Sequence, residues 1–150
     1  ISMEDTRFLH CNIKTLNLIP SVIAYQRCME QGCQETVFHR GDRVTECAHS
    51  NILMIKDGVL CTPPRDNLIL PGITLKHLLM LAEQNGIPTK EAPFTMQELA
   101  EADEVIVSSS GGLCTQAVEL DGKPVGGKAP ELLKKLQDAY AAYYAEDTKA

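Results

Sequence analysis

The chain has 150 residues, of which 44% are hydrophobic and 23% charged, with 14 Lys and Arg against 20 Asp and Glu. This composition excludes a collagen-like or disordered chain, and the length supports one core without disulfides or metal. The net charge of −6 argues against a general binder of nucleic acid or anionic membranes, and we find no apolar run of the roughly 18 residues that cross a bilayer.

The cysteines indicate a reducing compartment. No two of them form a C-x-x-C pair, and no His lies at zinc-ligand spacing. We therefore expect free buried thiols, no metal site and a cytoplasmic location. The cysteines are Cys11, Cys28, Cys33, Cys47, Cys61 and Cys114.

The first half of the chain reads as one helix among short strands. The apolar spacing of Leu18, Val22, Ile23 and Met29 predicts a helix that ends before Gly32. Turn dipeptides then separate strand-like runs, and Asp57-Gly58 is a strong hairpin signal. The runs predict a β-meander. The expected strands are 7–12, 35–40, 43–45, 51–56 and 59–62, and the expected helix is 17–31.

The second half mixes helices and strands. Thr95 to Glu98 has the S/T-x-x-E form of a capping box, which opens a short helix. We therefore expect a mixed α and β fold. The other expected segments are helices at 73–84 and 130–144 and strands at 89–94, 104–108 and 113–120, with a turn at 121–122.

Two segments have the form of an anion-binding loop. At 70–74 a glycine turn opens a helix, where free backbone N–H groups and the Thr74 hydroxyl can face a phosphate. At 108–112 a strand ends in three serines and two glycines, whose N–H groups can also hold an anion. Taken singly, such segments are more often an ordinary turn and a solvated loop.

Lys14 and Glu46 are the candidate reactive side chains. Lys14 lies in the least charged neighbourhood of any lysine here, and an apolar setting favours the free amine needed for Schiff-base chemistry. The alternative is an exposed lysine before a helix. Glu46 follows a strand and either faces a cationic ligand or is a surface turn residue. The four histidines, His10, His39, His49 and His77, form no catalytic arrangement and are expected at the surface or in turns.

In this order, these features resemble the C-terminal large domain of the fold-type IV, class IV aminotransferases that use pyridoxal phosphate, and most closely the D-amino-acid (D-alanine) transaminases. The resemblance covers nearly the whole chain, and it implies an α+β fold with a β-meander or pseudo-barrel and flanking helices. The matching segments are 12–18, 44–46, 50–51, 55–58, 68–74, 103–109 and 120–124.

The resemblance also implies roles for single residues. Lys14 would form the Schiff base with pyridoxal 5′-phosphate and move the substrate proton, and Glu46 would keep the pyridine nitrogen protonated. Leu70 would pack on the ring. The residues expected at the phosphate are Ile73, Thr74 and Ser110, with Ser109 and Ser50 as weaker candidates.

Two departures from the family pattern are expected to matter. Gly111, Gly112 and Leu113 stand where hydroxyl residues and an acid are common, and Cys47 and His49 replace small residues beside Glu46. The family's small N-terminal domain supplies further cofactor and substrate contacts that these residues do not include. Because the chain begins at Ile1, we expect residues 1–150 to be the C-terminal cofactor-binding half of a longer polypeptide.

The function expected from the resemblance is amino-group transfer between a D-amino acid, such as D-alanine, and a 2-oxo acid such as 2-oxoglutarate. The alternatives are a branched-chain L-amino-acid aminotransferase or aminodeoxychorismate lyase of the same fold, or a catalytically silent domain. The expected partners are these small molecules, the N-terminal domain and a second subunit in a homodimer, without nucleic acid or membrane.

Overall fold

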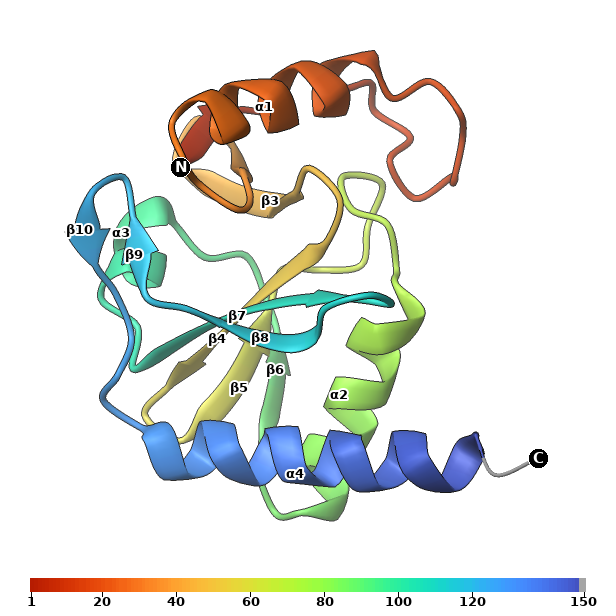
Figure 1. The fold of residues 1–150 in the computed structure, drawn as a ribbon, viewed down its shortest axis with the longest axis vertical. Coiled ribbons are helices and arrows are strands. Elements are labelled where there is room, and N and C mark those ends of the chain that lie inside the picture. The colour runs from red at the N-terminus through yellow and green to blue at the C-terminus, as the bar shows by residue number, and fades with distance from the viewer. Residues whose placement is uncertain (149–150) are drawn as a thin grey trace.

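A five-stranded sheet forms the centre of the fold in the computed structural model, which describes residues 1–148 (Figure 1). All of its strand pairs are antiparallel except β5 with β6. The pairing of β4 with β7 sets Asn51 opposite Ser108, so both residues lie at the same end of the sheet. In spatial order the strands are β6 (Thr89–Glu91), β5 (Val59–Thr62), β4 (Asn51–Lys56), β7 (Glu104–Ser109) and β8 (Leu113–Ala117).

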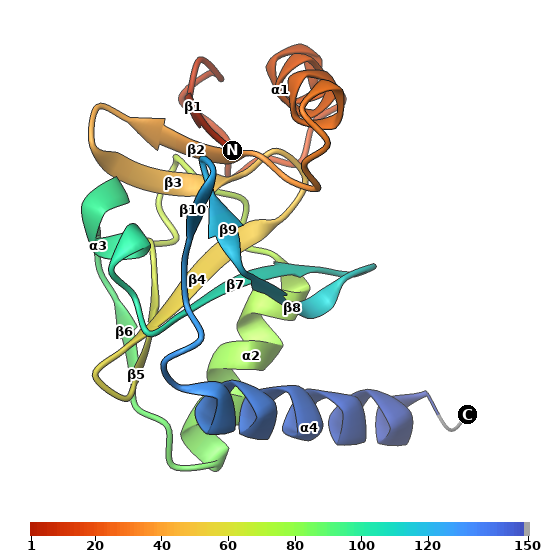
Figure 2. The same cartoon turned by 60° about the vertical axis from the view of Figure 1, so that its left-hand side comes forward.

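A smaller sheet, with one helix on it, covers part of one face of this sheet (Figure 2). It contains β1 (Ser2–Glu4), β2 (Val37–Arg40) and β3 (Arg43–Cys47). Helix α1 (Ile19–Glu30) packs on it through Ala24, which meets Phe38. The same face of the large sheet also contacts α3 (Met96–Ala100) and the hairpin of β9 (Glu119–Leu120) and β10 (Lys123–Pro124).

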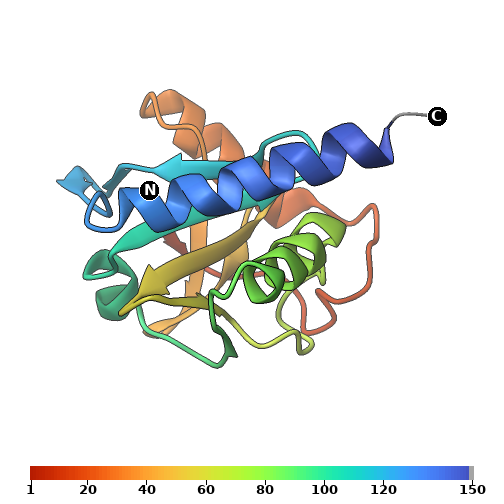
Figure 3. The same ribbon diagram turned by 90° about the horizontal axis from the view of Figure 1, so that it is seen from below.

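Two longer helices cover the opposite face. Helices α2 (Ile73–Gln84) and α4 (Pro130–Asp147) lie against the sheet, as the view from below shows (Figure 3). Their apolar side chains bury the centre of the domain, so the main core lies between this helical layer and the sheet. Its fully buried members include Leu53, Ile55, Leu60, Leu75, Leu78, Ile106 and Leu136.

The local signals in the sequence are confirmed. Asp57 and Gly58 have φ values of 50° and 78°, as a two-residue hairpin turn of the I′ kind requires. The Thr95 and Glu98 side chains form both bonds of the capping box at α3. Helix α2 spans the predicted residues, and the expected mixed α and β class is confirmed.

Four expectations about the strands change. The predicted strand 113–120 divides at Val118 into β8 and β9, which belong to different sheets. Residues 7–12 are not a strand, because this segment turns back where the Ile13 N–H donates to His10 O and Cys11 N–H to Asn67 O. Strand β6 ends at Glu91 instead of residue 94, since Phe94 turns into the core beside α3. The predicted meander divides between two sheets, because β3 and β4 belong to different ones.

The predicted apolar stripe of α1 faces outward. The helix instead buries the small residues Ser21, Ala24 and Cys28. The exposed fractions of the predicted stripe are 46% for Leu18, 56% for Val22, 48% for Ile23 and 51% for Met29. All six cysteines are free, and five of them are buried as expected, Cys33 being half-buried. Over residues 1–148, no helix has both the length and the apolar character needed to span a bilayer.

Candidate active site

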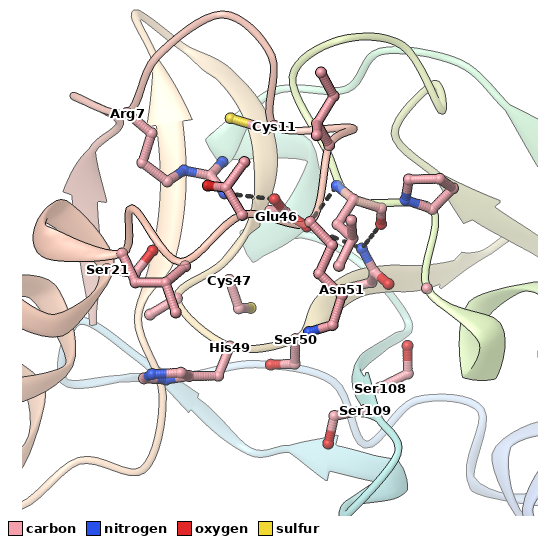
Figure 4. A pocket seen from close by; sticks show the side chains of 18 of the residues that line it. Arg7, Cys11, Ser21, Glu46, Cys47, His49, Ser50, Asn51, Ser108 and Ser109 are labelled. Carbon is pink, nitrogen blue, oxygen red and sulfur yellow. Dashed lines mark hydrogen bonds and ion pairs between the residues drawn. The ribbon is translucent and has the colours of Figure 1, made fainter.

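One cavity of about 480 Å³ collects the predicted site residues (Figure 4). It lies where the loop after β1, the start of α1, the turn after β3, the start of α2 and the end of β7 meet. Every residue named from the resemblance lines it: Lys14, Glu46, Ser50, Leu70, Ile73, Thr74, Ser109 and Ser110. Segments up to 96 residues apart in sequence thus meet around one space.

Glu46 lies near the end of β3 and is only 5% exposed. Its Oε2 accepts hydrogen bonds from Asn51 Nδ2 at 3.1 Å and from the Leu70 N–H at 3.0 Å. Its Oε1 contacts Arg7 Nη1. The carboxylate is therefore held from three separate segments, and the surface-turn alternative for this residue is wrong.

The charges around Glu46 are buried with it. Burial raises the pKa of Glu46 to about 7, against the opposing effects of the Arg7 charge and the bond from Leu70. Asp5 is also buried, but hydrogen bonds and charge from Arg7 hold its pKa below the ordinary value. The cavity is therefore lined by a buried acid, Glu46, whose protonation near neutral pH depends on the groups around it.

The start of α2 presents unpaired backbone donors to the cavity. No side chain caps this helix and no acidic residue lies in its first turn, which favours an anion there. Gly72 precedes the helix, and a Cβ at this position would lie 2.4 Å from Asn51 Oδ1. Asn51 also donates to Leu70 O at 2.8 Å, so it joins Glu46 to the segment that opens α2.

The serines at the end of β7 differ in their surroundings. The Ser108 hydroxyl is buried with no hydrogen-bond partner, and its residue lines the cavity. Ser109 Oγ accepts from the Gly112 N–H at 2.9 Å, which closes the turn, and Ser110 is exposed. Leu113 has a φ of 51°, so the chain adopts a left-handed conformation where β8 begins.

Lys14 lines the cavity but is not in the apolar environment expected from its neighbours. Its side chain is exposed, and the adjacent Ile13 and Leu16 are 56% and 98% exposed. The apolar residues around it face outward instead of covering the amine. The expectation of a desolvated lysine is therefore wrong for residues 1–148, although Lys14 and Glu46 line the same cavity.

Three residues of the site received no role from the sequence. These are Arg7, which contacts Glu46, Asn51, which bridges two segments, and Ser108, which is buried without a partner. The only local signal was the pair of opposite charges at Asp5 and Arg7, which precede Lys14 in the sequence. Within residues 1–148, no three His, Cys, Asp or Glu side chains are grouped as a metal site requires.

Comparison with known proteins finds relatives that carry the same name, D-alanine aminotransferase. The chain is 46% identical over 148 residues to a D-alanine aminotransferase of Listeria monocytogenes and 43% identical over 143 residues to one of Staphylococcus haemolyticus. The matches cover 98% and 95% of this chain but 50% and 51% of those proteins. The chain thus spans about half the length of the curated relatives it matches.

Solved structures share the fold. The branched-chain amino acid aminotransferase from Escherichia coli matches with a TM-score of 0.80 and 28% identity, over 95% of this chain and 52% of that one. A hypothetical aminotransferase from Mycobacterium tuberculosis has a TM-score of 0.82 at 20% identity, over 95% and 55% of the chains, which shows the fold alone. The family model for class IV amino-transferases matches residues 2–120. The chain therefore belongs to the class IV aminotransferase family.

Proposed function

We propose that this chain is the cofactor-binding half of a D-amino-acid transaminase. The enzyme would use pyridoxal 5′-phosphate to move an amino group between a D-amino acid, D-alanine above all, and a 2-oxo acid such as 2-oxoglutarate. The meeting of Lys14, Glu46 and the α2 N-terminus around one cavity carries the proposal. The names of the curated relatives favour the D-alanine substrate.

The residues of the cavity fit this cofactor. Glu46 is a buried acid that suits a ring nitrogen, and the uncapped start of α2 suits a phosphate. The Ser108 hydroxyl remains buried without a partner, as expected of a group that a ligand satisfies. When bound, pyridoxal phosphate supplies an electron-withdrawing ring that stabilises negative charge at the substrate carbon.

The chain's own residues would then bind the cofactor and move the proton. Lys14, which lines the cavity, would hold the cofactor through its amine and afterwards carry the proton at the substrate carbon. Glu46 would hold a proton on the ring nitrogen. Leu70 would lie against the ring. The phosphate would be bound by the Ile73 N–H, Thr74 and Ser110, with Ser109 and Ser50 in support. Ser50 donates to Glu35 Oε2 at 2.5 Å and Ser109 accepts from Gly112, so both are already held in place.

We further propose that an N-terminal domain of the same polypeptide and a second subunit complete the enzyme. The half coverage of the curated relatives supports the first of these. Exposed apolar side chains next to the cavity, among them Leu16 and Ile19, support the presence of a covering partner. Free thiols agree with a cytoplasmic location.

The test is whether Lys14 bonds the cofactor. Pyridoxal phosphate is added to the purified chain, the mixture is reduced with borohydride, and the peptides are analysed by mass spectrometry. We expect a pyridoxyl adduct at Lys14, and we expect Lys14→Ala to lose the adduct and its visible absorbance band. The matched control is Lys134→Ala, which changes an exposed lysine on α4. An adduct spread equally over several lysines, or none, would contradict cofactor binding by this chain and favour a silent domain.

The similarity to branched-chain aminotransferases motivates a second candidate, transfer from an L-amino acid. The two are separated by half-reactions of the full-length polypeptide with D-alanine and with L-leucine, followed by the cofactor absorbance. We expect D-alanine to change the spectrum. A change with L-leucine alone would establish the second candidate, and Lys14→Ala should abolish either reaction.

A further inference from the structure

Arg7 lines the cavity and lies between two buried acids, Asp5 and Glu46. Figure 4 shows Arg7 next to Glu46. Its Nε and Nη2 each donate to Asp5 at 2.9 Å, and Nη2 also donates to Leu68 O at 3.2 Å. The remaining Nη1 contacts Glu46. The guanidinium stacks over the Phe38 ring, 4.7 Å from its centroid. With its side chain only 11% exposed, Arg7 has one defined position.

We propose that Arg7 is a positioning residue that keeps Glu46 ionised and orients its carboxylate toward the ligand ring. The part of this inference that concerns the ring rests on the proposed function. The part that concerns Glu46 rests on the contacts within this chain.

The hydrogen bonds leave one oxygen of Glu46 with capacity to spare. Oε2 accepts from both Asn51 and Leu70, whereas among residues 1–148 Oε1 accepts from Arg7 alone. Each carboxylate oxygen has about two lone-pair sites. Arg7 therefore uses one site of Oε1 and fixes the direction of the other, which is the site available to a donor in the cavity.

The charge balance among the two buried acids, Asp5 and Glu46, and the arginines that contact them depends on Arg7. Arg40 Nε contacts Asp5 at 3.2 Å, and the described residues show no bond from Arg40 to Glu46. Without Arg7, two buried carboxylates would remain near one another with one cation, on the side of Asp5. Like charges at close range favour the protonated form, so Glu46 would become neutral.

Other ionisable groups near Glu46 do not replace Arg7. The thiols of Cys11 and Cys47 line the same cavity, and burial raises the pKa of each, so they contribute no charge near neutral pH. Lys14 also lines the cavity, but it is exposed and no bond joins it to Glu46 in the described structure. Arg7 is thus the cation that touches this acid.

The titration of Glu46 tests the inference without any cofactor. The chain is labelled with ¹³C at the glutamate carboxyls, and Glu46→Gln identifies the resonance. We expect Arg7→Gln to raise the midpoint by about one pH unit or more, and Arg7→Lys to restore most of that shift. Arg40→Gln removes a cation that touches Asp5 but not Glu46, so it is the matched control, with a shift below about half a unit. An unchanged midpoint in Arg7→Gln would overturn the inference.

A measurement on the unaltered chain covers the case in which Arg7→Gln fails to fold. The Leu70 amide, which donates to Glu46, and the guanidinium protons of Arg7 are followed by NMR against pH. We expect both to titrate with the Glu46 midpoint. Arg7 signals that stay constant while the Leu70 amide titrates would contradict the coupling.

Cofactor binding separates this inference from the proposed function. We expect Arg7→Gln to weaken pyridoxal phosphate binding by about tenfold at pH 7.5 and by less at pH 9, where Glu46 ionises again. If the unaltered chain binds no pyridoxal phosphate but its midpoint shifts in Arg7→Gln, the proposed function fails and the effect of Arg7 on Glu46 stands. If both proteins bind equally at both pH values with the same midpoint, the inference on Arg7 fails and the proposed function stands.

Discussion

Glu46 shows how one buried side chain links the site to the stability of the fold. The ionised carboxylate has three donors, yet its burial raises the pKa from an ordinary 4.5 to about 7. In the unfolded chain the group ionises near its ordinary value. The folded chain without a ligand therefore binds this proton more tightly than the unfolded chain does.

This difference predicts a pH dependence with a definite sign. Because the folded pKa is raised, the stabilisation is fully present below about pH 4.5 and is lost as the pH rises through about 7. We expect the free energy of unfolding to fall between pH 5 and pH 8 by up to about 3 kcal/mol through this group. Urea denaturation of the chain and of Glu46→Gln at several pH values measures it. The two proteins differ only at residue 46, so the contributions of all other groups cancel in the comparison, and parallel curves would contradict the prediction.

At the scale of elements, the side chain of Asn51 connects the large sheet to the segment that opens α2. Asn51, the first residue of β4, donates to Glu46 Oε2 and to Leu70 O, and it fills the space beside Gly72. Its amide is buried and bonded, so it has no free position to move into. The ring end and the phosphate end of the proposed site are thereby set at a constant separation.

A methyl group at Gly72 tests this contact. The φ of −63° suits any residue, so Gly72→Ala adds no backbone strain, only a collision with Asn51 Oδ1. We expect the free energy of unfolding to fall by about 1 to 3 kcal/mol, as in other overpacked sites. Asn51→Ala removes the collision, so the two substitutions together should cost less than their sum. Gly111→Ala is the control, because a Cβ there meets open space and the backbone is not left-handed, so its effect on stability should be nearly neutral. Gly58→Ala would be a poor control, because its φ of 78° strains any residue with a side chain. Additive effects of Gly72→Ala and Asn51→Ala would contradict the contact.

The elements that were predicted correctly are those whose conformation depends on residues close together in the sequence. The hairpin at Asp57-Gly58 and the capping box at Thr95 depend on a few positions in a row, and both are present. The strand at 7–12 was wrong because the path of this segment is set by distant partners, as with Cys11 and Asn67. The role of Arg7 was missed for the same reason, since its acid lies 39 residues away.

Several members of the candidate site were predictable from the sequence, but their environment was not. Motif order grouped Lys14, Glu46 and Thr74, and the structure places them around one cavity. The surroundings of Lys14 were not predictable, because an apolar neighbour in sequence covers a side chain only when the fold turns it inward. Leu16, two residues from Lys14, is 98% exposed.

At the scale of the whole molecule, the apolar surface is unevenly distributed. The segment 8–29, which includes Lys14 and α1, exposes a series of large apolar side chains next to the cavity. The large sheet, in contrast, is covered on both faces by packed elements. A concentration of exposed large apolar side chains in one segment is typical of a region that another chain or domain covers. Its members are Phe8, Leu9, Ile13, Leu16, Leu18, Ile19, Val22, Ile23, Tyr25 and Met29.

Substitutions on the two faces of α1 test whether this surface belongs to the core of the chain. Val22 is 56% exposed and Gln is the better helix former, so Val22→Gln should change the free energy of unfolding of the 150-residue chain by less than about 0.5 kcal/mol. Ala24 is 1% exposed, and Ala24→Gln should cost about 2 kcal/mol or more because a larger polar group enters a packed site. Urea denaturation compares both variants with the unaltered chain.

The same pair of variants distinguishes a covered face from a free one in the full-length polypeptide. If an N-terminal domain or a second subunit packs on α1, Val22→Gln becomes costly there while the effect of Ala24→Gln persists. We expect the loss at Val22 to exceed about 1 kcal/mol, since an amide would replace a buried apolar group. A Val22→Gln effect that is equally small in the chain and in the full-length polypeptide would contradict a cover at this position. Any cover over the exposed Lys14, which lines the cavity, would then have to leave Val22 free.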